Sequence, residues 1–180
     1  MNAIECIKTR RSVRKFTDQP VTKEQLQAVV EAAAWAPSWK NTQTVRYTAV
    51  TDPAVKQEIA EKAVHGFAWN TKIISGAPVL VVLTSVLGRS GYEKDGSFST
   101  SQGTHWQSFD AGAAAEAFCL AAHEAGLGSV ILGVIDEEAI RAILQIPETE
   151  GVAALIPVGL PDESPKAPRR KTAEELLRFV

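Results

Sequence analysis

The chain has 180 residues, of which 45% are hydrophobic, and its formal net charge at pH 7 is −2. This length is enough for one substantial hydrophobic core and too short for two, so we expect residues 1–180 to form a single domain. The near-neutral charge gives no general attraction to nucleic acid or to an anionic membrane, so we expect neither as a partner.

No segment of the sequence is long enough to cross a bilayer. The longest clean apolar run, Ala77–Leu83, is far shorter than the ~20 residues of a membrane helix, and no secretory signal is visible near the N-terminus. Cys6 and Cys119 lie far apart on apolar helical patterns, which favours two buried thiols over a disulfide. We therefore expect a protein of the reducing cytoplasm.

Hydrophobic periodicity and capping residues predict helices that alternate with strands. The first helix is Ala3–Thr9, and a capping box at Thr22 and Gln25 opens a second helix that ends at Ala36. The remaining elements, in chain order, are a strand at Val45–Thr51, a helix at Pro53–His65, a strand at Pro78–Val86, a helix at His105–Ala125, a strand at Ser129–Val134, a helix at Asp136–Leu144 and a strand at Val152–Leu160. Pro78–Val86 is almost entirely apolar, which is typical of a strand buried on both faces.

A long loop, Gly88–Thr104, separates the second strand from the longest helix. It contains four glycines and four serines, together with the aromatic residues Tyr92 and Phe98. A loop of this length in a compact domain is usually functional or mobile. One interpretation is a lid whose two rings bind a planar substrate, and the other is a disordered surface excursion.

A dense group of cations lies near the N-terminus. Six consecutive positions contain four cations and one hydroxyl: Arg10, Arg11, Ser12, Arg14 and Lys15. Guanidinium groups make bidentate, charge-assisted hydrogen bonds to phosphate, and a serine hydroxyl can contact a remaining phosphate oxygen. The alternative is a solvated basic loop, or cations that complement the C-terminal end of the first helix.

A second polar segment follows the helix that ends at Ala36. It is rich in amide and hydroxyl groups, at Ser38, Asn41 and Gln43. Amide side chains offer both donors and acceptors, which suits the edge of a heterocycle such as the pyrimidine ring of a flavin. The alternative interpretation is an ordinary helix end followed by a turn.

Several familiar sites are not supported by the sequence. There is no phosphate-binding loop for a nucleoside triphosphate, and Gly126-x-Gly128 precedes a predicted strand, whereas a dinucleotide fingerprint opens a helix. The three histidines, His65, His105 and His123, do not have metal-ligand spacing. No serine occupies a Gly-x-Ser-x-Gly elbow, so the sequence favours neither a metalloenzyme nor a hydrolase.

The order and spacing of these segments resemble one family. The motifs are Arg10-Arg11-Ser12-Val13-Arg14-x-Phe16, Ala36-Pro37-Ser38-x-x-Asn41-x-Gln43, Asn70 before an apolar strand, Asp110-Ala111-Gly112, Gly126-Leu127-Gly128-Ser129 and Pro168-Arg169-Arg170. In this order, and over nearly the whole chain, they closely resemble the FMN-dependent nitroreductase family.

The resemblance implies an α+β fold, with a central mixed sheet flanked by helices, and an intertwined homodimer with two FMN sites at its interface. One subunit would bind the FMN phosphate and ribityl chain, with Arg11 adding positive charge and Asn70 contacting the isoalloxazine. The residues implied for the phosphate and ribityl chain are Arg10, Ser12, Arg14 and Arg169, and main chain at Leu132 and Gly133 would face the flavin. The other subunit would contribute the second segment, at Pro37, Ser38, Asn41 and Gln43.

The resemblance also implies an activity. The enzyme would transfer hydride from NADH or NADPH to FMN and then reduce a small planar acceptor, a nitroaromatic or a quinone, by a ping-pong mechanism. No acid or base side chain is required, because the flavin performs the redox chemistry and the protein supplies placement and charge. Two alternatives are flavin chemistry on another substrate, such as an enone or a halogenated aromatic, and a non-catalytic flavin-binding protein.

Overall fold

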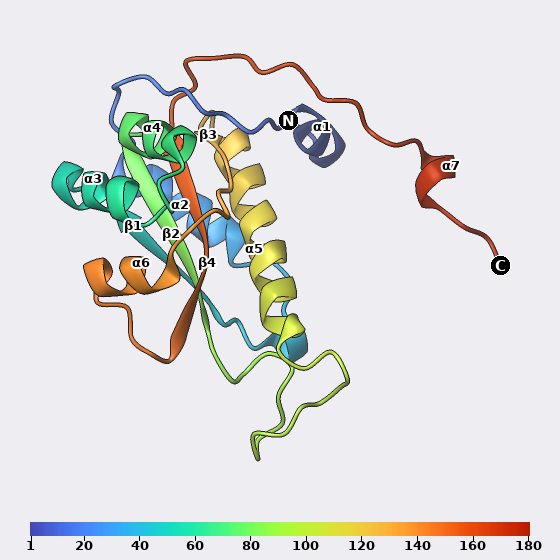
Figure 1. The fold of residues 1–180 in the computed structure, drawn as a ribbon. Coiled ribbons are helices and arrows are strands. Elements are labelled where there is room, and N and C mark those ends of the chain that lie inside the picture. The colour runs from blue at the N-terminus through green and yellow to red at the C-terminus, as the bar shows by residue number, and fades with distance from the viewer.

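The computed structural model describes all residues, 1–180, and is built around one small sheet (Figure 1). Its strands are β1 (Val45–Val50), β2 (Val79–Val86), β3 (Gly128–Ser129) and β4 (Glu150–Gly159), in the order β1-β2-β4-β3. All three neighbouring pairs are antiparallel, and the only parallel pairing is an isolated bridge between Ser12 and Ser129 at the β3 edge. The α+β fold is confirmed, with a sheet that is mixed only through that bridge.

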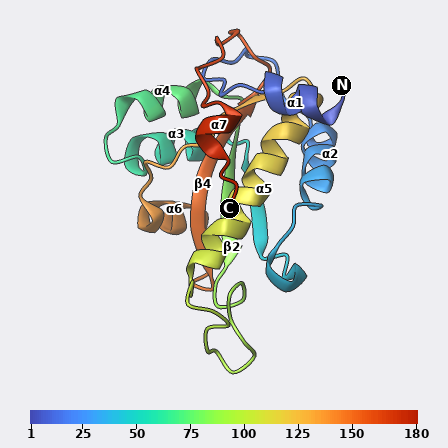
Figure 2. The same ribbon diagram turned by 90° about the vertical axis from the view of Figure 1, so that its right-hand side faces the viewer.

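The sheet has a hydrophobic core on each face. Val79, Val81 and Leu83 of β2 pack in the core under α2 (Lys23–Ala33) and α5 (His105–Glu124). The alternate residues Leu80 and Val82 pack in the other core, under α3 (Pro53–Lys62), α4 (Ala68–Gly76) and α6 (Glu137–Leu144). Figure 2 shows these two helical layers on either side of the strands. The apolar β2 sequence is thus explained, because successive side chains of a strand point to opposite faces.

Local signals determine where most helices begin and end. The capping box of α2 is present: Thr22 Oγ1 accepts from the Gln25 N–H at 3.2 Å, and Gln25 Oε1 accepts from the Thr22 N–H at 2.9 Å. The predicted end at Ala36 was three residues too late, because the N–H groups of Trp35 and Ala36 donate to carbonyls three residues earlier, at 3.2 and 3.0 Å, and do not continue the α-helical pattern. A proline at residue 37 then prevents any continuation.

Three short elements were not predicted, and one predicted strand was wrong. The missed elements are α4, the 3₁₀ helix η1 (Trp39–Asn41) and α7 (Ala173–Leu176). Of the strand predicted at Ser129–Val134, only Ser129 belongs to β3. Val130 and Leu132 are buried in the core, which accounts for the apolar pattern, but the segment pairs with the sheet only through the bridge between Leu132 and Leu155.

The two ends of the chain leave apolar surface exposed. The tail first runs beside the N-terminal segment, where the Asp162 N–H donates to the Lys15 carbonyl at 3.0 Å, and its last helix, α7, then lies well away from the sheet (Figure 1). Leu176 and Phe179 are 69% and 90% exposed, and Ile4 on α1 (Ala3–Thr9) is 61% exposed. Exposed large apolar side chains at both ends of the chain are candidates for an interaction surface. No helix of the structure has the length and apolar character needed to span a membrane.

Candidate functional site

The N-terminal cationic segment crosses one end of α5. Val13 and Phe16 are buried in the core and fix the segment, and the Val13 N–H donates to the Ser129 carbonyl at 3.0 Å. Arg14 and Lys15 lie between these anchors and are exposed. The alternation of apolar anchors with cations therefore places the charges on the surface while the backbone stays fixed.

The three arginines of this segment differ in how strongly they are already engaged. Arg10 Nε lies 3.3 Å from Glu116 Oε1. Arg11 donates only to the main-chain carbonyls of residues 8 and 10, and Arg14 donates only to the Ser12 carbonyl, at 3.2 Å. Glu163 also lies beside this group, and its Oε1 accepts from the Arg14 backbone N–H. Most guanidinium donors thus remain free for an anion.

The C-terminal tail brings further positive charge to the same place. A cavity of about 250 Å³ is lined by Arg10, Arg11 and Arg170, together with apolar tail residues. Arg169, the tail residue implied by the resemblance, is exposed and does not line this cavity. The structure therefore joins the two cationic groups of the sequence, with Arg170 in the cavity-facing position.

Asn70 and the predicted flavin-facing backbone lie together, and neighbouring residues of α4, Trp69 and Ile73, line a cavity with Arg14 and Lys15. Asn70 is on α4, is only 4% exposed, and donates from Nδ2 to the Val134 carbonyl at 3.3 Å. Leu132 is fixed by hydrogen bonds in both directions with Leu155, at 2.8 and 3.1 Å. The Gly133 N–H donates to no protein acceptor, and a methyl group placed on Gly133 would meet no protein atom within 4 Å. This N–H is therefore available to a ligand.

The second polar segment, residues 37–43, is fixed by a buried acid on α5. Asp110 is 2% exposed and accepts from the Trp39 N–H at 3.0 and 3.1 Å and from Ser90 Oγ at 2.7 Å. Ser38 Oγ accepts from the Gln43 N–H at 3.0 Å, which closes the segment into a compact loop. A buried carboxylate must accept hydrogen bonds to be stable, and the bonds from the Trp39 N–H to Asp110 fix the path of the loop.

Three residues of this loop have left-handed backbone conformations. The φ angles are 45° at Lys40, 54° at Asn41 and 47° at Gln43. Asparagine tolerates this region, whereas lysine and glutamine pay about 1–2 kcal/mol each. Strain of this kind concentrates at functional sites and persists only where surrounding contacts enforce it. Asn41 is exposed, its backbone N–H donates to the Ser38 carbonyl at 3.0 Å, and its side-chain amide has no hydrogen-bond partner within the chain.

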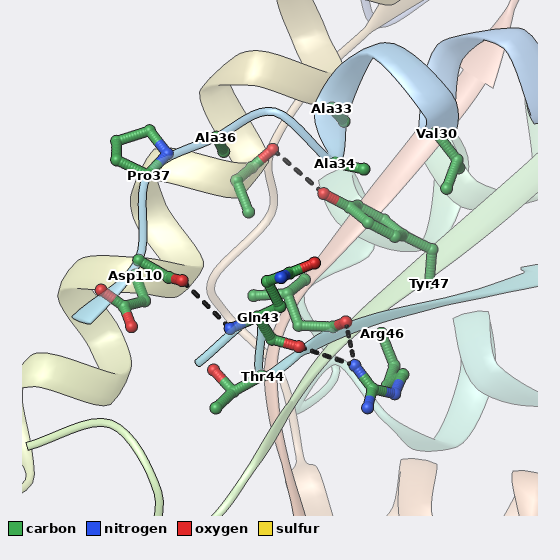
Figure 3. Close-up of a pocket in the computed structure, with 13 residues that line it drawn as sticks. Val30, Ala33, Ala34, Ala36, Pro37, Gln43, Thr44, Arg46, Tyr47 and Asp110 are labelled. Atoms are coloured by element: carbon green, nitrogen blue, oxygen red, sulfur yellow. Dashed lines mark hydrogen bonds between the residues drawn. The ribbon is translucent and has the colours of Figure 1, made fainter. Parts of the chain in front are cut away.

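A cavity of about 340 Å³ lies behind this loop (Figure 3). Its lining is mostly apolar and includes Pro37, Ser38, Gln43 and Tyr47, with Asp110 at one side. The Tyr47 hydroxyl donates to the Ala114 carbonyl at 3.3 Å, and burial raises the pKa of Tyr47 to about 12. The phenol is therefore neutral at physiological pH, and the charged residues of the lining are Arg46 and Asp110.

The two halves of the predicted site do not meet within one chain. Asp110 fixes residues 37–43 near the beginning of α5, whereas His123 near its end lies 2.9 Å, Nε2 to Oγ1, from Thr9 beside the cations. At 1.5 Å per residue the helix rises about 20 Å between these two positions. Figure 1 shows α1 and the short helix that precedes β1 at opposite ends of α5. A complete site would therefore need a second chain.

The long loop is folded and contacts the second segment. Its central turn is closed by the hydrogen bond from the Glu93 N–H to the Ser97 carbonyl, at 2.8 Å, and the Tyr92 and Phe98 ring centroids lie 4.9 Å apart. Lys40 Nζ lies 2.8 Å from Glu93 Oε1, which connects the loop to residues 37–43. The two predicted ring residues thus come together, and Phe98 remains 55% exposed.

The comparisons with known proteins agree with this architecture. The model of the nitroreductase family matches residues 7–160. The chain belongs to the nitroreductase family. One relative is the NADPH-flavin oxidoreductase of Vibrio harveyi, which is 32% identical over 179 residues. The alignment covers 98% of this chain and 72% of the relative. The resemblance seen in the sequence is confirmed.

Solved structures show the same fold. An FMN-dependent nitroreductase from Clostridium difficile is 28% identical, with a TM-score of 0.78 and coverage of 98% of both chains. A nitroreductase-family protein from Streptococcus pneumoniae superposes with a TM-score of 0.86 over 99% of this chain and 100% of its own, and at 23% identity this shows the fold alone.

The sequence indicated no contacts for two residues that contact the candidate site segments of this chain. Asp110 was visible only as part of the motif Asp110-Ala111-Gly112, and nothing in the sequence indicated that its carboxylate is buried and accepts from the Trp39 N–H. His65, whose Nε2 lies 2.9 Å from the Ile135 carbonyl oxygen, gave no signal, because no local pattern reveals a contact 70 residues away.

Proposed function

We propose that two copies of this chain bind FMN between them and catalyse hydride transfer from NADH or NADPH to the flavin, followed by reduction of a small planar acceptor. The observation that carries the proposal is the free Gly133 N–H beside buried Asn70, close to a cluster of free guanidinium donors. The names of the relatives support the same chemistry, since they include an NADPH-flavin oxidoreductase and an FMN-dependent nitroreductase.

The cationic cluster has the chemistry needed for the FMN phosphate. Arg10, Arg11 and Arg14 offer planar donor pairs, and the Ser12 hydroxyl can contact a remaining oxygen or the ribityl chain. Each charge-assisted hydrogen bond contributes about 1.5–3 kcal/mol. We assign a supporting role to the tail, through Arg169 and through Arg170, which lines the shared cavity.

The flavin ring would lie over the segment that contains Leu132 and Gly133. When bound, FMN accepts hydride from the nicotinamide and passes the electrons on to the acceptor. The Gly133 N–H would be free to donate to the flavin near its hydride-accepting atom, and Asn70 would border the ring. These donors are fixed before any ligand arrives, so they need little reorganisation during the reaction. The protein contributes no acid or base in this scheme.

The partner chain would complete each site with Pro37, Ser38, Asn41 and Gln43. Two features support this arrangement: the separation of the two half-sites along α5, and the exposed apolar surface of α1, α7 and α5, where Phe109 is 65% exposed. Gly112 and Ala113 on α5 would allow a second helix to approach closely. The extended tail would wrap the partner and make the dimer intertwined.

We further infer a single domain that works in the cytoplasm, with a nitroaromatic or a quinone as acceptor. Both cores are built on one sheet, so neither half of the chain could fold alone. Cys6 and Cys119 are free, buried thiols, which fits a reducing compartment. A ping-pong mechanism follows if nicotinamide and acceptor occupy the same face of the flavin in turn.

Anaerobic titration of the purified protein tests this function. We expect a yellow protein whose visible flavin absorption bleaches on addition of NADPH or NADH and returns when a quinone or nitroaromatic is added. Protein without flavin, also after incubation with FMN, would contradict the proposal. Flavin that neither nucleotide bleaches would identify a flavin-binding protein, and bleached flavin reoxidised only by an enone or a halogenated aromatic would favour that alternative substrate class.

The long loop is proposed as a lid over the acceptor. It is tied to residues 37–43 by the ion pair between Lys40 and Glu93, so it would lie beside the flavin bound mainly by the partner. Phe98→Ala and Tyr92→Ala should change the ratio of kcat/KM between bulky and small acceptors by roughly 3- to 10-fold. This is the size of effect expected when one apolar or stacking contact with the acceptor is lost. FMN affinity should stay the same.

The matched control for the lid is Lys94→Ala, an exposed residue of the same loop. Acceptor preference measured over a panel of quinones and nitroaromatics should not respond to this change. A flat preference for both aromatic variants would show that other residues close the pocket.

A further inference from the structure

The backbone around Gly133 is held by hydrogen bonds on both sides. Leu132 pairs with Leu155, the Val134 carbonyl accepts from Asn70 Nδ2, and the Asp136 N–H donates to the Ala63 carbonyl at 2.8 Å. One further contact completes this set, between Ile135 and the side chain of His65. Gly133 itself, in the middle, keeps its N–H free.

His65 is aimed at this segment by an unusual turn. The connection between α3 and α4 passes through His65 and Gly66, with φ angles of 49° and 68°. The turn directs the imidazole so that Nε2 lies 2.9 Å from the Ile135 carbonyl oxygen. Because a carbonyl can only accept, Nε2 must carry the proton. Strain at a non-glycine residue, combined with a specific side-chain contact, is typical of a position with a defined task.

The contacts of His65 are polar and directed at one segment. Its side chain is 59% exposed, so it adds little to the hydrophobic core. Its Nδ1 faces Asp136 Oδ2 at 4.0 Å, and the Oδ1 atom of the same carboxylate caps α6 by accepting from the Ala139 N–H at 3.1 Å. His65 therefore touches both the carbonyl two residues after Gly133 and the start of the following helix.

We propose that His65 is a positioning residue, which holds residues 133–136 so that the Gly133 N–H points at the flavin. The link of this inference to catalysis rests on the proposed function. The contact between His65 and the Ile135 carbonyl does not depend on it, because both groups are part of the protein. Without the imidazole, the Ile135 carbonyl loses its partner and the segment opens more often. The Gly133 N–H then spends less time in the orientation that serves the hydride-accepting atom.

The first test is hydrogen exchange of the apoprotein. His65→Ala should speed exchange of the Leu132 and Asp136 amides by about 2- to 10-fold, the effect of losing one net hydrogen bond. His65→Gln places an amide donor near the position of Nε2 and should restore slow exchange. Lys62→Ala, at the end of the same helix, is the matched control, since Lys62 pairs only with Glu58 on its own helix. Unchanged exchange in His65→Ala, or equally faster exchange throughout the protein, would overturn the inference.

The second test measures flavin reduction in the FMN-loaded protein. At saturating NADPH, the single-turnover reduction rate should fall by about 2- to 10-fold in His65→Ala and recover in His65→Gln, with little change in the nucleotide concentration for half-maximal rate. Normal rates in both variants would overturn this role while leaving the proposed function intact. A wild-type protein that cannot be loaded with FMN would overturn the proposed function instead, and with it the catalytic link of His65.

Discussion

Replacing Arg14 by alanine is expected to weaken FMN binding by about 1.5–3 kcal/mol, roughly a 10- to 100-fold increase in Kd. The Arg14 guanidinium donates only to the Ser12 carbonyl, so its remaining donors are free for phosphate. Its backbone N–H, which donates to Glu163, is retained in the variant, and the side chain is exposed. The fold should therefore survive, as a thermal unfolding curve can verify.

Arg10→Ala should also weaken FMN binding, but by less. Arg10 Nε lies 3.3 Å from Glu116 Oε1 in the free protein. A bound phosphate competes with this ion pair, so the net contribution of Arg10 to FMN affinity is smaller than that of Arg14. Flavin fluorescence titration of the apoproteins measures both effects, with Lys23→Ala, a cation at the start of α2, as the control. If both arginine variants bind FMN with wild-type affinity, the cationic cluster has no phosphate role and is a solvated basic loop.

The second large effect concerns the assembly. Light scattering at micromolar concentration is expected to give twice the 19.4 kDa chain mass, because one chain cannot bring its two half-sites together. Phe109, Ile4 and Leu176 are exposed in the single chain and would be buried in an interface of the obligate class, above about 2,000 Å². A monomer that still binds FMN tightly would contradict the shared site.

Much of the fold could be predicted from local signals. The capping box of α2, Pro53 at the first position of α3 and the apolar run of β2 each act over a few residues, so the sequence reveals them directly. The helix α4 escaped prediction because its N-terminus has no side-chain cap and its sequence follows a glycine. The segment 129–134 is apolar because it is buried, and an apolar pattern alone cannot distinguish a strand from an irregular buried segment.

The candidate site was predictable in its residue types and not in its geometry. The cations of residues 10–15 and the polar segment 37–43 were recognisable from composition and spacing. The left-handed conformations at Lys40 and Gln43 were not, because the loop is fixed by contacts that include the Trp39 N–H bond to Asp110, 71 residues away. The contact of His65 with Ile135 is likewise set by tertiary packing. Contacts between residues far apart in the chain produce no periodic pattern in the sequence, so they cannot be predicted from it.

Mixed dimers test the central claim most directly. One chain would contain Arg10→Ala and Arg14→Ala, and the other Asn41→Gly, which keeps the left-handed backbone and removes the amide. Each homodimer should bind FMN poorly. After unfolding and refolding together, half of the dimers are hybrids with one intact site of two, so about a quarter of all sites should regain tight FMN binding and NADPH-dependent flavin reduction. Hybrids that are detected by native mass spectrometry but regain neither property would contradict an FMN site shared between two chains.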